Sequence, residues 1–334
     1  MARGKMSLRV LAGLTAFALA GLTACGTGGG APGASGGGGE KKAIGVSVAD
    51  QKSLFYVAAV QGMQAQAEKR GYKLVVTSAN NNSSQQVSQV NDLLTQQVGA
   101  LIFTSQDSTA AAAGVKAANK AQVPVIAVDQ RPESGQGQLA TYIATDSVKA
   151  ARDLCTWMFQ QMGGSGEIAI LHGVLGSTAE IQRTQGCQEA IKATPGIKVV
   201  AEETANWDET EAFKATQNIL AAHPQLKAVF GESDAMGLGA AKAAQQANRH
   251  DGMQFVGIDG FPTMFDGVKA GLTQATMAQQ PYHMGEIAVD NAIQIMEGGA
   301  ALPAEQYQDT VLINKDTVDQ NDVTKFYGPN AKSS

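Results

Sequence analysis

The stretch Val123-Pro-Val-Ile-Ala-Val-Asp129 carries the pattern that decides the fold. A short β-branched run that ends on a carboxylate is typical of a strand buried on both faces, with a polar side chain just beyond its carboxyl end. Residues 254–258, followed by Asp259, repeat this pattern far along the chain. The repetition indicates more buried strands than one small sheet holds.

Apolar runs of this kind alternate with Ala- and Gln-rich segments of helical period from residue 43 onward, as expected of repeated β-α units. We predict strands at residues 43–48, 73–77, 100–104, 123–128 and 141–145, then at 167–172, 197–202, 227–231, 254–258 and 272–277. Helices are predicted at residues 53–70, 84–97, 148–161, 178–193, 208–222 and 234–247, with Asp208 and Asp234 as N-caps. A later helix through Met296 and a short strand at 310–313 complete an α/β chain with two sheets of about five strands each.

Composition points to a globular chain without an affinity for polyanions. The 334 residues are 44% hydrophobic and 5% aromatic, which suffices for two lobes with real cores. The formal net charge is −5, and it becomes more negative if the first 24 residues, with Arg3, Lys5 and Arg9, are removed. We therefore expect no binding of nucleic acid or of an anionic membrane surface.

The N-terminus has the order of a secretory signal, with basic residues, an uncharged run and then small residues before Cys25. The uncharged run is shorter than the ~20 residues of a bilayer-spanning helix, so we expect no permanent transmembrane anchor. Leu22-Thr-Ala-Cys25 resembles a bacterial lipobox, which implies cleavage before Cys25 and its acylation; an ordinary signal peptide with an incidental cysteine is the alternative. Residues 26–39 are almost all Gly, Ala, Ser, Thr and Pro, which suits a leash. The expected location is extracytoplasmic, lipid-anchored to the outer face of the cell membrane.

The other two cysteines, Cys155 and Cys187, have two interpretations. In an exported protein they can form a disulfide, or they can remain two buried free thiols.

Polar residues stand just past the predicted strands, where open parallel sheets bind ligands. The set is rich in carboxylates and includes one tryptophan: Asp50, Thr104, Asp129, Asp146, His172, Trp207, Ser233 and Asp259. A carboxylate accepts hydrogen bonds from neighbouring hydroxyls, and an aromatic face packs against the C–H side of a sugar. The set as a whole favours a neutral polyhydroxylated ligand, whereas each aspartate taken alone is more simply a helix N-cap or turn former.

The chain resembles a sugar-binding lipoprotein of the ribose-binding type, with the type 1 periplasmic binding protein fold that serves ABC importers. The resemblance spans residues 44–315. Its motifs, in order, are Phe55-Tyr56, Val123 to Asp129, Gly176 through Arg183 to Gly186, Asn206-Trp207-Asp208, His223-Pro-Gln-Leu-Lys-Ala-Val-Phe230 with Asp234-Ala-Met236, Val256-Gly-Ile-Asp-Gly260, and Ala275-Thr-Met-Ala-Gln279.

The resemblance implies an α/β fold of two similar doubly wound parallel-sheet lobes joined by three crossovers, near Thr145, Gln279 and Asp309. The implied division is a signal peptide (1–24), a lipidated Cys25 with a Gly-rich linker (25–42), a first lobe (43–145 plus 280–309), a second lobe (146–279 plus 310–326) and a tail (327–334). The segment after Asp316 is interpreted as a partly ordered end.

The same resemblance implies the roles of the ligand-binding residues. Phe55 and Tyr56 would form an aromatic wall from the first lobe, and Trp207 its counterpart from the second. Asp129 and Asp259 would accept hydrogen bonds from ring hydroxyls, Arg183 would donate, and Gln279 would touch the ligand at a hinge crossing. The full expected set is Phe55, Tyr56, Thr104, Asp129, Gln130, Arg183, Trp207, Ser233, Asp259 and Gln279.

Three departures from the ribose-type pattern bear on the ligand. The pattern has Arg directly after its Asp, but here Gln130 follows Asp129, and Arg131, one place later, is expected to point elsewhere. Thr104 and Ser233 stand where the pattern has Asn. The loop before Phe55, Asp50-Gln-Lys-Ser-Leu54, is longer than in the pattern and lacks its Asn-Pro. These changes leave more room in the expected binding site and remove hydrogen-bond donors from it. A different pentose, a hexose or a sugar alcohol therefore fits at least as well as D-ribose.

The implied function is that of a substrate-binding protein that presents a monosaccharide or polyol to an ABC permease and its ATPase, as a monomer and without cofactor or metal. We expect no enzyme, because Gly237-Leu-Gly239 lies inside a predicted helix rather than in the tight turn of a dinucleotide site. His283 with Glu286 is not a zinc spacing. A sugar-responsive regulator of the LacI type would need a basic helix-turn-helix at the N-terminus, where this sequence has the predicted signal and the glycine-rich linker instead. Two alternatives stay open: a sugar-binding protein that reports to a membrane sensor, and the same fold binding a non-sugar small solute.

Overall fold

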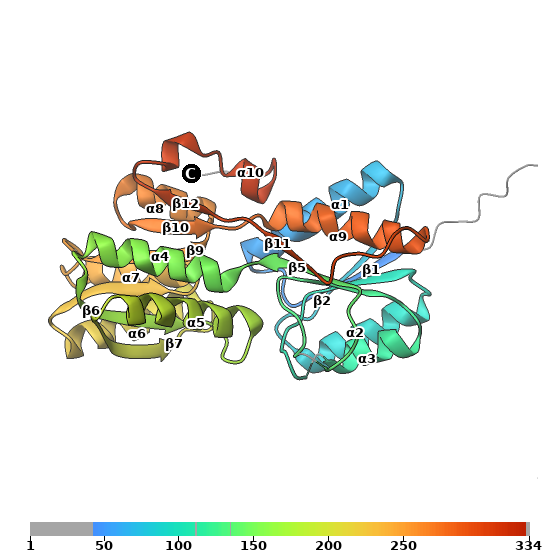
Figure 1. The fold of residues 1–334 in the computed structure, drawn as a ribbon, viewed down its shortest axis with the longest axis horizontal. Coiled ribbons are helices and arrows are strands. Elements are labelled where there is room, and N and C mark those ends of the chain that lie inside the picture. Colours follow the sequence, from blue (N-terminus) through green and yellow to red (C-terminus); the bar gives the residue numbers. More distant parts are fainter. Residues whose placement is uncertain (1–42, 111, 134, 332–334) are drawn as a thin grey trace, which may run out of the picture. The chain divides into compact units, whose positions relative to one another are not determined.

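The computed structural model describes residues 43–110, 112–133 and 135–331. They form two six-stranded sheets with helices packed on them (Figure 1). The predicted α/β fold with two doubly wound sheets is therefore confirmed, with one more strand in each sheet than expected. The predicted signal peptide, the lipobox cysteine Cys25 and the linker lie outside the described residues.

The first sheet has the order β11-β5-β4-β3-β1-β2, and its paired strands are parallel. Its strands are β1 (Ile44–Val48), β2 (Leu74–Ser78), β3 (Ala100–Phe103), β4 (Val125–Val128), β5 (Thr141–Thr145) and β11 (Glu305–Gln308). The register pairs Val48 with Ser78 and Ser47 with Phe103, so the carboxyl ends of these strands lie at one edge. Because β1 lies between β2 and β3, the strand order reverses there, and such a switch point opens a crevice for ligands.

The second sheet repeats this plan with the order β12-β10-β9-β8-β6-β7, in which only the β10–β12 pair is antiparallel. Its strands are β6 (Ser165–His172), β7 (Gly196–Thr204), β8 (Leu226–Gly231), β9 (Gln254–Asp259), β10 (Ala275–Ala278) and β12 (Val311–Asn314). Its switch point lies at β6, between β7 and β8. Alternate residues of β6 enter different cores: Ile168 and Ile170 pack in one, and Ala169 and Leu171 in another. Both faces of the sheet are therefore buried.

Helices cover both sheets in pairs (Figure 1). On the first sheet, α1 (Leu54–Arg70) pairs with α9 (Pro281–Met296), and α2 (Ser83–Thr95) pairs with α3 (Ala112–Lys120). On the second sheet, α4 (Ser147–Gln161) pairs with α5 (Thr178–Ala193), and α6 (Glu209–Ala222) pairs with α7 (Asp234–Gln246). The second sheet also carries the shorter α8 (Pro262–Ala270). Two glycines let α1 and α9 approach closely, since a Cβ on Gly62 or Gly285 would lie 2.0 or 2.1 Å from a carbonyl oxygen of the other helix. None of the helices in the described ranges is long and apolar enough to cross a membrane.

The chain passes between the two sheets three times, after β5, after β10 and between β11 and β12. These passages confirm the three-segment hinge expected near Thr145, Gln279 and Asp309. We call the first sheet with its helices the first lobe, and the second sheet with its helices the second lobe.

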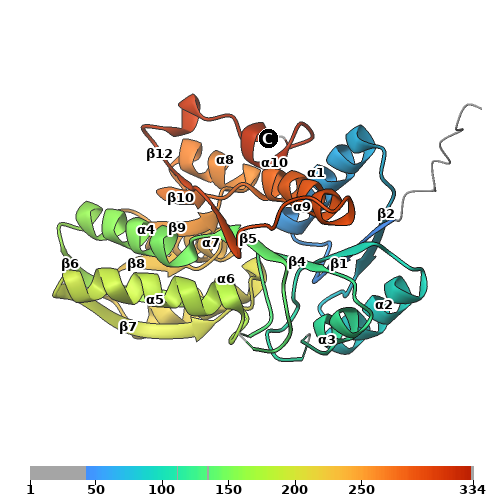
Figure 2. The same cartoon turned by 45° about the vertical axis from the view of Figure 1, so that its right-hand side comes forward.

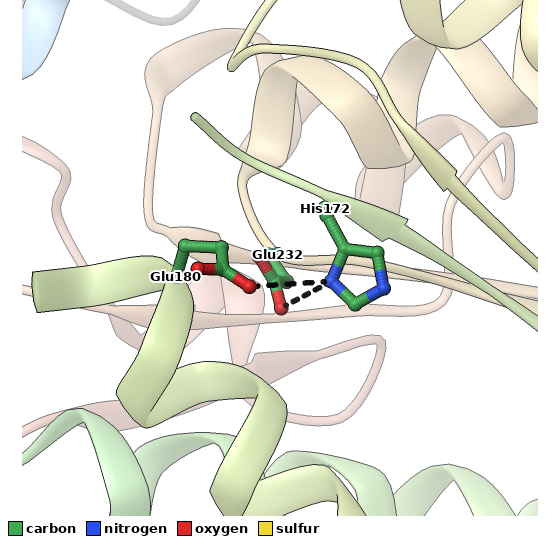
Figure 3. A group of neighbouring side chains, drawn as sticks. All are labelled: His172, Glu180 and Glu232. Carbon is green, nitrogen blue, oxygen red and sulfur yellow. Dashed lines mark hydrogen bonds and ion pairs between the residues drawn. The ribbon is translucent and has the colours of Figure 1, made fainter. Parts of the chain in front are cut away.

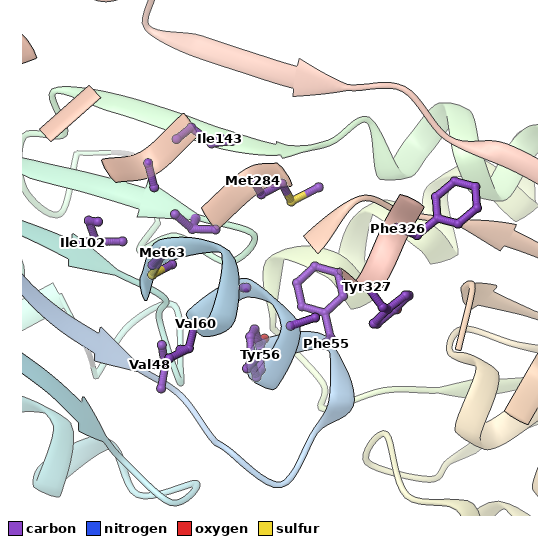
Figure 4. Packing of buried hydrophobic residues seen from close by; sticks show 14 of the residues in the cluster. Val48, Phe55, Tyr56, Val60, Met63, Ile102, Ile143, Met284, Phe326 and Tyr327 are labelled. Atoms are coloured by element: carbon purple, nitrogen blue, oxygen red, sulfur yellow. The ribbon is translucent and has the colours of Figure 1, made fainter. Parts of the chain in front are cut away.

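Residues 317–331 form a packed segment, contrary to the partly ordered end that was expected after Asp316. It contains a 3₁₀ turn (Val318–Gln320) and α10 (Thr324–Tyr327), and its apolar side chains Val323, Phe326 and Tyr327 are buried. The segment leaves β12 of the second sheet, and α10 then packs on α1 and α9 of the first lobe (Figure 2). Figure 4 shows Phe326 and Tyr327 near Phe55 at the start of α1.

The two predicted N-caps differ in outcome. The Asp208 carboxylate accepts from the backbone N of Glu211 at 2.8 Å and caps α6, as predicted. The prediction for Asp234 was wrong, because Ser233 caps α7 and Asp234 is its first residue. The buried Asp234 carboxylate instead accepts from the backbone N of Gly260 and of Phe261, each at 2.7 Å. Asp234 therefore fixes the turn that follows β9.

Cys155 of α4 and Cys187 of α5 form a disulfide, with their Cα atoms 5.5 Å apart. Both cysteines are fully buried in the core of the second lobe.

Candidate functional site

A cavity of about 810 Å³ lies beyond the carboxyl ends of both sheets and is lined by both lobes. Every predicted ligand-binding residue except Thr104 lines it. Thr104 is 1% exposed, its backbone N donates to the carbonyl of Ser47, and its own carbonyl accepts from the Gln86 amide. Thr104 follows the end of β3 at Phe103, but these hydrogen bonds hold it in the buried edge of the sheet, and Gln106 lines the cleft instead.

The polar wall of the first lobe consists of three side chains joined by hydrogen bonds. The Tyr56 hydroxyl donates to Oδ2 of Asp129 at 3.0 Å, and the Gln130 amide donates to the Tyr56 oxygen at 3.1 Å. Asp129 has a φ of 61°, which is uncommon for a residue other than glycine and turns the chain at the end of β4. Burial raises the pKa of the Asp129 carboxyl, while Arg183 and the Tyr56 hydroxyl oppose that rise. The Tyr56 bond uses Oδ2, so Oδ1 of Asp129, which has no hydrogen bond from a side chain in the described ranges, can accept from a ligand hydroxyl.

The aromatic part of the first-lobe wall comes from the start of α1. Phe55 and Tyr56 stand edge to face, with ring centroids 5.4 Å apart. Phe261, which the sequence analysis did not single out, lines the same cleft and packs against Tyr327 with centroids 5.7 Å apart.

The polar wall of the second lobe centres on Asp259 at the end of β9. Its Oδ1 accepts from the Gln279 amide at 2.8 Å and from Nη1 of Arg183 at 3.5 Å. Burial raises the pKa of the Asp259 carboxyl, and the Arg183 guanidinium counteracts this. Nε of Arg183 and Oε1 of Gln279 are buried without a hydrogen-bond partner among the described residues. Such groups are costly unless something satisfies them, and a bound polar ligand can do so.

Trp207 is held flat against the backbone of the second lobe. A Cβ on Gly173 would lie 2.0 Å from the indole, so the ring rests directly on that glycine. The Arg183 guanidinium carbon lies 5.5 Å from the centre of the ring. The motif neighbour Asn206 also lines the cleft, and both Asn206 and Trp207 have positive φ, at 50° and 63°.

Arg131 lies outside this cleft, as expected from its displacement by one residue. Its guanidinium pairs with the Glu305 carboxylate at 2.6 Å and lies 4.4 Å from the ring centre of Tyr142. The arginine therefore ties the loop after β4 to β11, and Gln130 occupies the cleft in its place.

Of the other residues expected past the strands, Asp50 lines the cleft, whereas Asp146 and His172 do not. Asp146 caps α4 by accepting from the backbone N of Lys149 at 3.0 Å. The mouth of the cleft is acidic: it carries Asp50, Asp208, Glu209 and Glu211 against Lys52.

His172 belongs to a separate group with Glu180 and Glu232, whose ligand atoms lie within 4.8 Å of one another (Figure 3). This is the group within the described ranges whose donors could hold a metal ion. The sequence analysis missed it, because its members come from different elements without a motif spacing.

The comparisons with known proteins agree with this architecture. The family model of the periplasmic binding protein domain matches residues 44–300. The ribose import binding protein of Bacillus subtilis is 34% identical over 262 residues, which cover 78% of this chain and 84% of that protein. The xylitol-binding protein of Mycolicibacterium smegmatis is 36% identical over 233 residues, which cover 70% of this chain and 66% of that protein.

A solved structure extends the likeness to the fold. It is an ABC transporter solute-binding protein from Agrobacterium vitis with bound alpha-D-tagatopyranose, and it has a TM-score of 0.81 and 26% identity over 86% of this chain and 99% of that chain. Sequence and fold agree, and the chain belongs to the periplasmic binding protein family, as a type 1 binding protein of the ribose-binding type.

Proposed function

We propose that this protein binds a monosaccharide or sugar alcohol between its lobes and delivers it to an ABC permease for import. The observation that carries the proposal is the two-sided cleft, in which Asp129 and Tyr56 of the first lobe face Asp259, Arg183 and Trp207 of the second. Carboxylates that accept, a guanidinium that donates and aromatic faces form the set that a ring or chain of hydroxyls requires. None of these contacts needs a charged ligand.

The charges around the cleft support a neutral ligand. An acidic mouth and two buried carboxylates disfavour sugar phosphates and sugar acids, because each brings a negative charge toward other negative charges. The relatives named above are binding proteins for ribose and for xylitol, and the solved structure contains bound tagatopyranose; all three ligands are neutral polyhydroxylated molecules.

The proposed cycle uses the three crossovers as a hinge. Ligand contacts to both walls favour the closed arrangement of the lobes, a hinge motion well known for periplasmic binding proteins. The closed form is what we propose the permease recognises, with Cys25, acylated after signal cleavage, holding the protein at the outer face of the membrane.

A thermal-shift screen tests the binding step. The mature chain with Cys25→Ser, so that it stays in solution, is screened against pentoses, hexoses, sugar alcohols, sugar acids, amino acids and nucleosides. A ligand at a hundred times its dissociation constant adds about 2.7 kcal/mol to the free energy of unfolding, which raises the midpoint by a few degrees. A shift confined to a neutral sugar or polyol supports the proposal. A shift with an amino acid or nucleoside alone keeps the fold and overturns the sugar assignment.

A further inference from the structure

A buried cluster of ionisable groups lies behind the second-lobe wall. His172 ends β6, Glu202 lies on β7, Glu180 and Thr184 lie on α5, and Glu232 follows β8. Glu232 is 0% exposed, and His172 and Glu180 are each 8% exposed. The Glu180 and Glu232 carboxylates point toward Nδ1 of His172, at 3.7 and 3.2 Å (Figure 3).

Both ring nitrogens of His172 face carboxylates. Nδ1 lies 3.2 Å from Oε1 of Glu232, and Nε2 lies 2.9 Å from Oε2 of Glu202. An ionised carboxylate only accepts, and a neutral imidazole carries a proton on one nitrogen alone. The Thr184 hydroxyl lies 3.1 Å from Nδ1 but donates to Oε1 of Glu232 at 2.6 Å, so it supplies no proton to the ring. Favourable contacts with both carboxylates therefore require the imidazolium, which also neutralises one of the buried charges. The hydrogen bond to Glu232 is the main cause that raises the pKa of His172 to about 9.

Glu232 connects this cluster to the cleft. Its Oε2 accepts from the backbone N of Gly173 at 2.9 Å, and Gly173 is the residue on which Trp207 rests. Its backbone carbonyl accepts from Nη1 of Arg183. The next residue, Ser233, lines the cleft. Three elements of the second-lobe wall therefore meet at one buried glutamate.

We infer that His172 is a positioning residue: as an imidazolium it holds Glu232 in place, and through Glu232 it fixes Trp207 and Arg183 in the arrangement that binds ligand. The inference rests on the proposed function and extends it, since it names the residue that holds the second-lobe wall in its ligand-binding arrangement. Loss of the proton leaves Glu232 buried without its cation while Glu180 and Glu202 add negative charge, so the wall must rearrange.

The first test needs no ligand. With Trp157→Phe as background, leaving Trp207 as the tryptophan in the described part of the chain, its emission is followed from about pH 7 to about pH 10 while NMR reports the protonation of the His172 ring. We expect both ring nitrogens to be protonated at neutral pH, and the emission to change together with loss of that proton. His172→Gln should remove the transition, whereas His283→Gln, at an exposed His–Glu pair of 3.1 Å, should leave it unchanged.

Because His172→Gln can fail to fold, Glu202→Gln is a second variant. Glu202 is 48% exposed at its side chain, and removal of its charge should lower the transition pH without unfolding the protein. The inference is overturned if His172 is neutral at neutral pH, if the Trp207 transition persists in His172→Gln, or if Glu202→Gln leaves the transition pH unchanged. It is also overturned if Zn²⁺ raises the thermal midpoint of the wild type but not of Glu180→Gln, since the cluster would then be a metal site.

The second test asks whether the wall matters for binding, with xylitol and D-ribose as probes. Where either probe binds, its dissociation constant should rise about tenfold or more across the same transition in the wild type and in His283→Gln, and should be independent of pH in His172→Gln. A dissociation constant that does not follow the transition overturns the link to binding. If neither probe binds, the proposed function is weakened, while the fluorescence and NMR results still decide the role of His172.

Discussion

The hydroxyl of Tyr327 donates a hydrogen bond of 2.9 Å to the backbone carbonyl of Asp259. Tyr327 ends α10, which packs on the first lobe, whereas Asp259 ends β9 of the second. Asp259 has a φ of 154°, a conformation that costs energy in a residue other than glycine and persists when its surroundings hold it. The C-terminal segment therefore joins the two lobes at a cleft residue, in addition to the three crossovers.

Tyr327→Phe should lower the free energy of unfolding by about 1 kcal/mol, because the buried Asp259 carbonyl then keeps the backbone N of Gln279 but loses its second donor. Ligand binding should weaken as well, since the Asp259 peptide can then relax. Urea unfolding and calorimetry measure the two effects. Tyr307→Phe is the matched control: Tyr307 is 46% exposed, and a change there should stay within about 0.5 kcal/mol. Equal effects of the two variants would contradict a special role for Tyr327.

Arg183→Ala should weaken binding of the sugar or polyol by a few kcal/mol, roughly a hundredfold. Arg183 is 3% exposed and contacts Asp259 and the Glu232 carbonyl, so its removal takes the cation from a buried carboxylate and a donor from a buried carbonyl. Arg152→Ala removes the same side chain from a surface pair with Glu189 at 3.2 Å, and should leave affinity unchanged. Calorimetry that gives one affinity for the wild type and both variants would refute the place of Arg183 in the site.

Gly173→Ala should displace Trp207 from the cleft wall. The added Cβ would lie 2.0 Å from the indole, so the ring must move, and the affinity should fall about tenfold or more. Coupling identifies the cause: in a Trp207→Ala background the same glycine substitution should cost little further affinity. Gly114→Ala on α3 is the control, since its Cβ would meet the Val90 side chain of α2 at 3.3 Å, and it should not change binding. Additive losses in the double variant would show that Gly173 acts without Trp207.

The sequence was sufficient to predict the elements that bury apolar runs and the residues that end them. Asp129 follows β4 and Asp259 ends β9, and both line the cleft because the carboxyl ends of parallel strands share one edge. Thr104 follows β3 in the same way but fails the rule, because hydrogen bonds with Ser47 and Gln86 hold it inside the sheet edge.

The remaining features depend on contacts between distant segments. β11, with the sequence EQYQ, has no apolar run and exists as a strand because it pairs with β5. Residues 317–331 were misinterpreted because their few apolar side chains are separated by polar ones, yet Phe326 and Tyr327 pack in a core that draws residues from both lobes. The cluster around His172 draws on four separate elements, so no spacing in the sequence indicates it.

Reduction of the disulfide between Cys155 and Cys187 should lower the free energy of unfolding by about 3–4 kcal/mol, because the bond closes a loop with a sequence separation of 32. Intact mass after alkylation tests the bond itself: without reductant neither cysteine should react, and with reductant and denaturant both should. Urea unfolding of the oxidised protein and of Cys155→Ser with Cys187→Ser then measures the energy. Two alkylated thiols without reductant would instead support the free-thiol alternative.

The raised pKa of His172 predicts how stability depends on pH. With a folded pKa of about 9 against about 6.5 in the unfolded chain, the folded state binds more protons between these values. The contribution of His172 is therefore complete below about pH 6.5 and is lost as the pH rises through about 9, and its upper limit is about 3 kcal/mol.

Asp259 adds a slope of the same sign, because burial raises its pKa too, so the decisive quantity is the difference between variants. Urea unfolding at several pH values should show a decline from pH 6.5 to 9 that is steeper in the wild type and in His283→Gln than in His172→Gln. Parallel curves for all three proteins would mean that His172 titrates alike in both states, and its contacts with Glu202 and Glu232 would then add nothing to the stability of the fold.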